Sequence, residues 1–146
     1  MLEVIGITDE FVKYTQVVSL TYDQRRKGRL KTFCDSGMSL GLFLERGKLL
    51  VDGDFLITKT GEIIKVISRP EPLVSASSKS FITISKICYH LGNRHVPLEI
   101  KKDHVFFQPD HVLEDLCRDW GLKVESISRP FNPEFGAYGR NVTHHV

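Results

Sequence analysis

Histidine is the residue type of this chain that points most directly to chemistry. Neutral imidazole binds nickel, copper and zinc with high affinity, yet it exchanges more readily than a closed cage of thiolates. His144 and His145 are adjacent in a segment expected to be flexible, so they either swing onto a metal that other groups already hold or form a plain polar terminus. The remaining histidines are His90, His95, His104 and His111.

His95 lies in the most distinctive segment, a tight corner expected between a helix and a strand. Gly92 and Asn93 tolerate the left-handed backbone region and are expected to end the helix, and Pro97 is expected to start the strand. One imidazole cannot hold a transition metal against water, so a lone loop histidine is more often a surface residue. Two copies related by a two-fold axis near this corner would place two His95 side chains face to face as two ligands.

Composition and charge set limits on the class of protein. The 146 residues are 41% hydrophobic and 26% charged, which is ordinary for a globular chain. The formal charge of +2 arises from 20 basic and 18 acidic residues, a balance that favours neither nucleic acid nor a membrane as partner. With no long apolar run and no basic leader, we expect a cytoplasmic protein. The cysteines Cys34, Cys88 and Cys117 are far apart and lack C-x-x-C spacing, so we expect reduced thiols, with Cys88 and Cys117 buried among apolar helix positions.

The periodicity predicts an α+β protein whose first module, residues 1–70, is small and all-β. Short runs rich in β-branched and aromatic residues are separated by turn signals, and Lys59-Thr60-Gly61 predicts a hairpin. Proline lacks a backbone donor, so Arg69–Pro72 is the expected linker. The predicted strands are Gln16–Tyr22, Arg29–Cys34, Leu40–Glu45, Phe55–Lys59 and Glu62–Ser68.

The second module, residues 71–130, is predicted to be ferredoxin-like. Apolar residues at helical spacing predict one helix over Ser80–Leu91 and another that starts at Asp110 and ends at Gly121. Strand-like pieces around them give the order β-α-β-β-α-β, with both helices on one face of an antiparallel sheet. Residues 131–146 lack periodicity and predict a flexible tail. Modules of about 70 residues bury little surface, which favours oligomerisation.

Six segments, in the right order along nearly the whole chain, resemble the E-type urease accessory proteins, which are nickel chaperones. The sequence departs from the family pattern in two places: its tail has only two histidines where some relatives carry long tracts, and Pro109 replaces the first of two histidines that flank Asp110 in some members. The matching segments are Leu20–Arg29, Gly41–Gly47, Leu50–Asp54, His90–Pro97, Asp110–Glu114 and Gly136–Gly139.

The resemblance implies a nickel-binding metallochaperone that does no bond-making chemistry of its own. It implies a peptide-binding-like first domain and a ferredoxin-like second domain that forms a homodimer, with one metal site shared through His95. His144, His145 and His111 are the further candidate ligands, and the ion is Ni(II), with Zn(II) or Cu(II) as alternatives. The expected partners are the urease apoprotein and urease accessory proteins that include a GTPase. His90 and His104 are expected to be structural.

Other interpretations remain open on the sequence alone. A metal-independent peptide-binding scaffold would act through the first module. An RNA-binding ferredoxin-like protein is suggested by Val105-Phe106-Phe107, although the basic and glycine-flanked aromatic signature is absent. The G-x-S-x-G pattern at residues 37–41 joins two predicted strands, where a hydrolase needs a strand, an elbow and a helix. The basic cluster over residues 25–31 is either a docking patch for an acidic partner or a protected strand edge.

Overall fold

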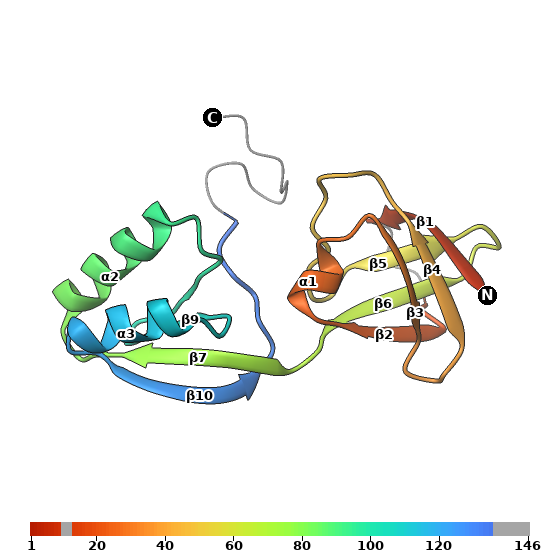
Figure 1. Cartoon of the computed structure of the whole chain (residues 1–146). Helices are drawn as coiled ribbons and strands as arrows, with labels where there is room; N and C mark the ends of the chain where they lie inside the picture. The colour runs from red at the N-terminus through yellow and green to blue at the C-terminus, as the bar shows by residue number, and fades with distance from the viewer. Residues whose placement is uncertain (10–12, 136–146) are drawn as a thin grey trace. The chain divides into compact units, whose positions relative to one another are not determined.

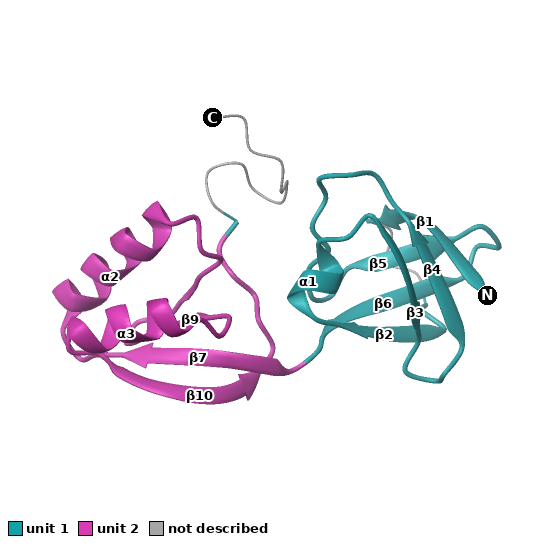
Figure 2. Cartoon of the chain, viewed as in Figure 1, with its two compact units in different colours: residues 1–69, 135–146 teal, residues 70–134 magenta. Residues whose placement is uncertain are grey.

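The computed structural model describes residues 1–9 and 13–135, and it divides the chain into two compact units (Figures 1 and 2). Among the described residues, unit 1 comprises Met1–Arg69 together with Phe135, and unit 2 comprises Pro70–Glu134. None of the helices in the described ranges is long and apolar enough to cross a membrane.

Unit 1 is a six-stranded, barrel-like sheet. Two pairings are parallel, β1 with β4 and β2 with β6, and the others are antiparallel. Just after β3, the Asp35 N–H donates to the Val17 carbonyl at 2.8 Å and its carboxylate accepts from the Ser19 N–H at 3.1 Å, so the two edge strands meet at that end. The strand order is β2-β6-β5-β1-β4-β3, with bounds β1 Leu2–Thr8, β2 Gln16–Leu20, β3 Arg29–Phe33, β4 Ser39–Phe43, β5 Phe55–Thr58 and β6 Ile63–Ser68.

The inward face of this sheet is a closed apolar core. Alternate strand residues share a face, so each strand contributes every second side chain to the interior. The predicted hairpin between β5 and β6 is confirmed, with Gly61 at φ 87° in the turn. Residues with no exposed surface include Val4, Val18, Leu20, Leu40, Leu42, Leu50, Leu56, Ile64 and Val66.

Unit 1 differs from the predicted all-β module at two places. Strand β1 was not predicted, and the strand expected to run through Tyr22 ends at Leu20, where a short helix α1, Tyr22–Arg25, follows. The Thr21 side chain accepts from the Gln24 N–H at 3.3 Å, and the Gln24 side chain accepts from the Thr21 N–H at 2.9 Å. This reciprocal capping box satisfies the free donors at the helix start, and the Thr-x-x-Gln spacing is its sequence signal.

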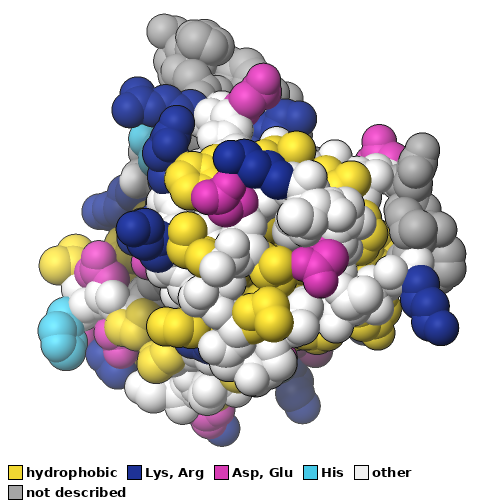
Figure 3. All heavy atoms as spheres, turned by 90° about the vertical axis from the view of Figure 1, so that its right-hand side faces the viewer, with side chains coloured by type: hydrophobic (Ala, Val, Ile, Leu, Met, Phe, Trp, Pro, Cys, Tyr) yellow, Lys and Arg dark blue, Asp and Glu magenta, His cyan; other side chains and the backbone are white. Residues whose placement is uncertain are grey.

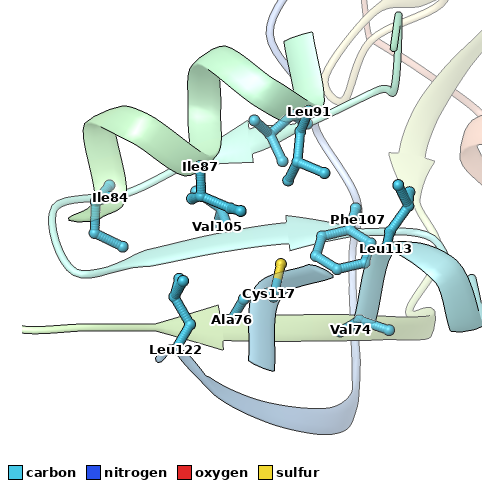
Figure 4. Packing of buried hydrophobic residues seen from close by; sticks show 11 residues of the cluster. Val74, Ala76, Ile84, Ile87, Leu91, Val105, Phe107, Leu113, Cys117 and Leu122 are labelled. Carbon is cyan, nitrogen blue, oxygen red and sulfur yellow. The ribbon is translucent and has the colours of Figure 1, made fainter. Parts of the chain in front are cut away.

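Unit 2 has the predicted order β-α-β-β-α-β. Its sheet runs β10-β7-β9-β8 with antiparallel pairing throughout. Both helices pack their apolar stripes on the same face of the sheet, where Ile87 and Cys117 meet Ala76 and Phe107 in one cluster (Figure 4). The elements are β7 Glu71–Ser77, α2 Phe81–Asn93, β8 Glu99–Ile100, β9 His104–Phe107, α3 His111–Asp119 and β10 Lys123–Arg129.

The predicted linker and the predicted start of the tail both need correction. Pro72, expected in a linker, lies within β7 opposite Ser128; β9 pairs with β7 only from Val74 onward, so Pro72 interrupts no ladder on that side. Phe131, expected to be the first residue of the flexible tail, has a fully buried side chain instead. The Glu134 N–H donates to the Leu98 carbonyl at 2.9 Å. Residues without periodicity are ordered here by irregular backbone pairing.

Candidate metal centre

Helix α2 carries His95 on its C-terminal corner. Its N-cap is Ser80, whose hydroxyl accepts from the Thr83 N–H at 3.2 Å. One stripe of the helix is buried against the sheet, and the opposite stripe leaves large apolar side chains in solvent. The exposed fractions are 80% for Phe81, 59% for Ile82 and 67% for Tyr89. The helix therefore packs one apolar stripe against its own unit and also exposes apolar side chains on its outer face.

The helix ends in a Schellman motif with His95 at its left-handed position. The His95 N–H donates to the Gly92 carbonyl at 3.0 Å, and the Val96 N–H donates to the Leu91 carbonyl at 3.3 Å. Val96 packs against the core cluster that contains Leu91, which is the apolar contact typical of this motif. Gly92 and Asn93 were expected to take the left-handed conformation; they are helical instead, and His95 itself has φ 56°.

A histidine at this position is a local exception to the usual backbone preferences. The left-handed region costs an L-residue with a Cβ about 1–2 kcal/mol, which is why glycine is the usual residue there. Across the described ranges, His95 is the one residue other than glycine with a positive φ. Its side chain is exposed, and no described side chain forms a hydrogen bond or an ion pair with it. The corner thus fixes the backbone of a residue whose imidazole is accessible.

His111 stands at the first position of α3. It is exposed, and the Asp110 carboxylate before it caps the helix by accepting from the Val112 N–H at 2.9 Å and the Leu113 N–H at 3.2 Å. That carboxylate oxygen is therefore engaged by the backbone. Pro109 supplies no ligand on the other side, so His111 lacks an adjacent imidazole.

The other two described histidines of unit 2 lie beside aromatic rings, and its two cysteines lie in or against the apolar core. The His90 ring centroid lies 5.0 Å from that of Trp120, and the His104 ring stacks at 5.9 Å on Phe106. Burial raises the pKa of the Cys117 thiol to about 11, and it also raises the pKa of Cys88. Only the thiolate binds metals well, so these protonated thiols are poor ligands at neutral pH.

The described part of one chain presents single imidazoles rather than a finished metal site. Within residues 1–9 and 13–135, no three His, Cys, Asp or Glu side chains gather as a group able to hold an ion, so His95 and His111 do not join such a cluster. His144 and His145 lie outside the described residues. The left-handed conformation of His95 was missed because Gly92 and Asn93 are the better local candidates for it.

The serine pattern at residues 37–41 has no hydrolase geometry. Gly37 has φ 94° in the turn between β3 and β4, and Ser39 is the first residue of β4. A nucleophile elbow needs a helix after the serine, and here a strand follows.

Comparison with known proteins gives the same family over both units. Residues 13–68 match the model of the N-terminal domain of the UreE urease accessory protein, and residues 71–146 match that of its C-terminal domain. The urease accessory protein UreE of Alteromonas mediterranea is 43% identical over 128 residues, covering 88% of this chain and 83% of that protein. The protein of the same name from Psychromonas ingrahamii is 45% identical over 122 residues, covering 84% and 80%. This chain therefore belongs to the UreE family of urease accessory proteins.

Proposed function

We propose that this chain carries Ni(II) as cargo and delivers it to the urease apoprotein, together with accessory proteins that include a GTPase. The observation that carries the proposal is the exposed imidazole of His95, held in a left-handed corner where glycine would be free of strain. An unfavourable backbone conformation that persists at an accessible ligand indicates a functional requirement for the side chain. Membership of a urease accessory family supplies the destination of the metal.

The second element of the proposal is a homodimer formed through unit 2, which we regard as a ferredoxin-like domain because of its strand order β10-β7-β9-β8. Phe81, Ile82 and Tyr89 leave apolar surface exposed on α2, the helix whose C-terminal corner carries His95. A second copy covering this surface would remove it from water. A two-fold axis close to the corner would bring the two His95 imidazoles together, which supplies the second ligand that one chain lacks.

The remaining ligands are assigned to the tail. Two facing imidazoles leave coordination positions open on a divalent ion, and His144 and His145 supply the donor type that nickel accepts well. His111 is a weaker accessory ligand, since neither neighbour in sequence provides another imidazole. A site made of imidazoles from several segments can lose them one at a time, which suits an ion that must be passed on. Zn(II) and Cu(II) fit the same donors, so selectivity has to be measured.

The RNA-binding alternative loses its main support in the structure. An aromatic face that stacks bases must be exposed. Phe107 is fully buried in the core between sheet and helices, and Phe106 is only 6% exposed. The metal-independent scaffold remains the competing function, and it predicts that nickel and His95 are both irrelevant to urease activation.

Titration calorimetry with Ni(II), Zn(II) and Cu(II) tests the proposal. The wild-type protein should bind about one tight Ni(II) per two chains, because the site is shared across a two-fold axis. His95→Ala should lower nickel affinity by roughly a hundredfold or more, because both facing ligands are lost at once, without unfolding the chain. His104→Ala is the matched control, since His104 is an exposed histidine of the same unit on strand β9. Equal affinity in the His95 and His104 variants would contradict the proposal.

Urease activation in cells separates carrier from scaffold. With His95→Ala in place of the wild-type protein and nickel limiting, we expect urease activity to fall and to recover when nickel is supplied in excess. Activity that is unchanged at limiting nickel would support the metal-independent scaffold instead.

A further inference from the structure

After its last strand, the chain crosses from one edge of the unit 2 sheet to the other. The two edge strands are β10 and β8. Arg129 ends β10 opposite Glu71, and three residues later the Asn132 N–H donates to the carboxylate of Glu99, on β8, at 2.9 Å. Figure 1 shows the chain after β10 turning back toward the segment that joins α2 to β9. Residues 130–134, the crossing segment, therefore carry the chain over about 14 Å, which is three strand spacings.

The crossing segment starts on the face of the sheet that the helices leave uncovered. Val105 and Phe107 belong to the core under the helices, so Phe106 between them points to the other face. Glu99 is the partner of Phe106 on β8, and the guanidinium carbon of Arg129 lies 4.1 Å from the Phe106 ring centroid. The 2.8 Å ion pair between Arg129 and Glu99 therefore fixes the start of the segment on this face.

The rest of the crossing segment alternates as a strand does. Phe131 and Pro133 are buried, whereas Asn132 and Glu134 are exposed. Both exposed residues are held through their backbone, and the Glu134 N–H donates to the Leu98 carbonyl at 2.9 Å. The β-α-β-β-α-β fold is already complete at the end of β10. The crossing segment is therefore an addition to that fold, and its effect is to decide where the chain leaves unit 2.

The point of departure lies close to the candidate ligand. Glu134 is the last residue of unit 2. Leu98 follows His95 by three residues, so their Cα atoms are at most about 11 Å apart. Residues paired between extended segments have Cα atoms about 5.5 Å apart. Glu134 therefore lies within about 17 Å of His95, whereas a chain released at Arg129 would leave from the opposite edge of the sheet.

Unit 1 offers no imidazole that tail histidines could join. Residues 1–69 contain no histidine, and all six histidines of the chain come later. On the side of unit 1, Figure 3 shows exposed hydrophobic side chains interspersed with Lys, Arg, Asp and Glu. A shared imidazole site that includes the tail therefore has to be sought on unit 2.

We propose that the crossing segment positions the tail so that His144 and His145 close on the ion at His95. This inference rests on the proposed nickel function and adds the device that sets the local concentration of the tail ligands. His144 follows Glu134 by ten residues, and a random coil of ten residues has an r.m.s. end-to-end distance of about 17 Å. A tether is most effective when this distance matches the span that it must cover.

Release of the crossing segment has a calculable cost. The tether to His144 would begin at Arg129 instead of Glu134, which adds five residues and moves its origin to the far edge of the sheet. Both changes lower the local concentration of the tail histidines at His95, together by roughly fivefold. The residues of the crossing segment are thus positioning residues, and none of them has to touch the ion.

The first test compares two variants that differ in two backbone donors. The release variant carries Phe131→Ala, Asn132→Pro and Glu134→Pro. The control carries Phe131→Ala, Asn132→Ala and Glu134→Ala, so it loses the same side chains but keeps both N–H groups. Circular dichroism and Trp120 fluorescence confirm that both variants fold. Titration calorimetry should give a nickel affinity roughly fivefold lower for the release variant than for the control. Equal affinities would overturn the proposal.

The same pair without tail histidines shows whether the crossing segment acts through the tail. With His144→Ala and His145→Ala added, the release variant and the control should agree within about twofold. An equal loss on release in both backgrounds would show that the segment supports only the His95 corner, and it would overturn the proposal. Unchanged nickel affinity when the tail histidines are removed from the wild type would overturn it too. The His95→Ala titration decides the carrier function separately.

The second test needs no metal. Arg94→Cys, beside His95, is combined with His144→Cys, and equilibrium with glutathione gives the effective concentration of the two thiols. This value should be roughly fivefold higher in the control than in the release variant. Lys79→Cys with His144→Cys is the matched pair, since Lys79 is an exposed residue just before the other end of α2, and it should gain nothing from the crossing segment. Equal values for release and control in the Arg94 pair would overturn the proposal. The background for all these variants replaces the native thiols by alanine at Cys34, Cys88 and Cys117.

Discussion

His95 and Glu99 lie four residues apart in unit 2, but the side chain of His95 is exposed and that of Glu99 is buried. His95 is exposed at the end of α2 and has no side-chain partner among the described residues. The Glu99 side chain is only 5% exposed and is held from several sides. One oxygen lies 2.8 Å from the Arg129 guanidinium and 3.6 Å from the Lys101 ammonium, and the other accepts from the Asn132 N–H at 2.9 Å.

The difference separates a group that holds the fold from a group that is available to a ligand. A buried carboxylate must have its lone pairs satisfied, because an unpaired charge in the interior is very unfavourable. Glu99 is satisfied by β10 and by the segment after it, and in this way it fixes residues 129–132 onto the sheet. An imidazole that exchanges metal needs the reverse: its position comes from the backbone alone, and its nitrogen atoms stay open.

The largest effect on stability is expected at Glu99. Glu99→Ala leaves the partly buried Arg129 guanidinium without its carboxylate and should lower the free energy of unfolding of unit 2 by about 3 kcal/mol. The fluorescence of Trp120, the single tryptophan of the chain, reports unfolding of this unit. Glu125→Ala is the matched control, because its ion pair with Lys123 is exposed to solvent and should contribute little to stability. If Glu99→Ala and Glu125→Ala lowered the free energy of unfolding equally, Glu99 would have no special role in holding the fold.

A smaller change of opposite sign is expected at His95. Glycine has no Cβ penalty at φ 56°, so His95→Gly should raise the free energy of unfolding by about 1 kcal/mol while it abolishes tight nickel binding. Arg94→Gly, one residue earlier at φ −90°, should instead lower stability, since it only adds freedom to the unfolded chain. Denaturant titration measures both. A His95→Gly variant less stable than wild type would show that the imidazole supports the fold.

The smallest effect of nickel is expected on the reactivity of the Cys117 thiol. This side chain is buried, as Glu99 is, although sulfur is a good ligand for many metals. With its pKa at about 11 against an ordinary 9.0, its thiolate fraction at pH 8 is roughly a hundredfold below that of a free thiol. In a variant with Cys34→Ser and Cys88→Ser, we expect slow labelling by a thiol reagent and less than about a twofold change on adding Ni(II). Because folding raises this pKa, its contribution to stability is complete below pH 9 and is lost as the pH rises toward 11. Protection of Cys117 by nickel would identify it as a ligand.

The elements with strong local signals could be predicted from the sequence. Helix α2 was predicted over Ser80–Leu91 from its apolar spacing, and α3 was predicted from Asp110, where a capping carboxylate and the apolar spacing agree. Strand β1 and helix α1 were missed. For α1, the β-branched run before Tyr22 outweighed the capping signal of Thr21 and Gln24. The order of β7 within its sheet depends on long-range pairing that no local pattern encodes.

The candidate site was predictable in its residue but not in its geometry. His95 stood out through its segment, whereas its left-handed conformation depends on where the helix closes, and Gly92 and Asn93 offered better local candidates. The burial of Phe131 was equally hidden, because the segment around it has no periodicity and is ordered by contacts with distant residues such as Glu99. Local patterns report propensity, and irregular tertiary pairing overrides it.

Native mass spectrometry of mixed dimers tests the shared imidazole site most directly. Wild-type and His95→Ala subunits of distinguishable mass are mixed, allowed to exchange, and supplied with less Ni(II) than there are dimers. The wild-type dimer should retain one ion per two chains, while the mixed dimer, with a single His95, should retain far less. Equal nickel occupancy of the mixed and wild-type dimers, or retention by single chains, would contradict a site built from two His95 side chains.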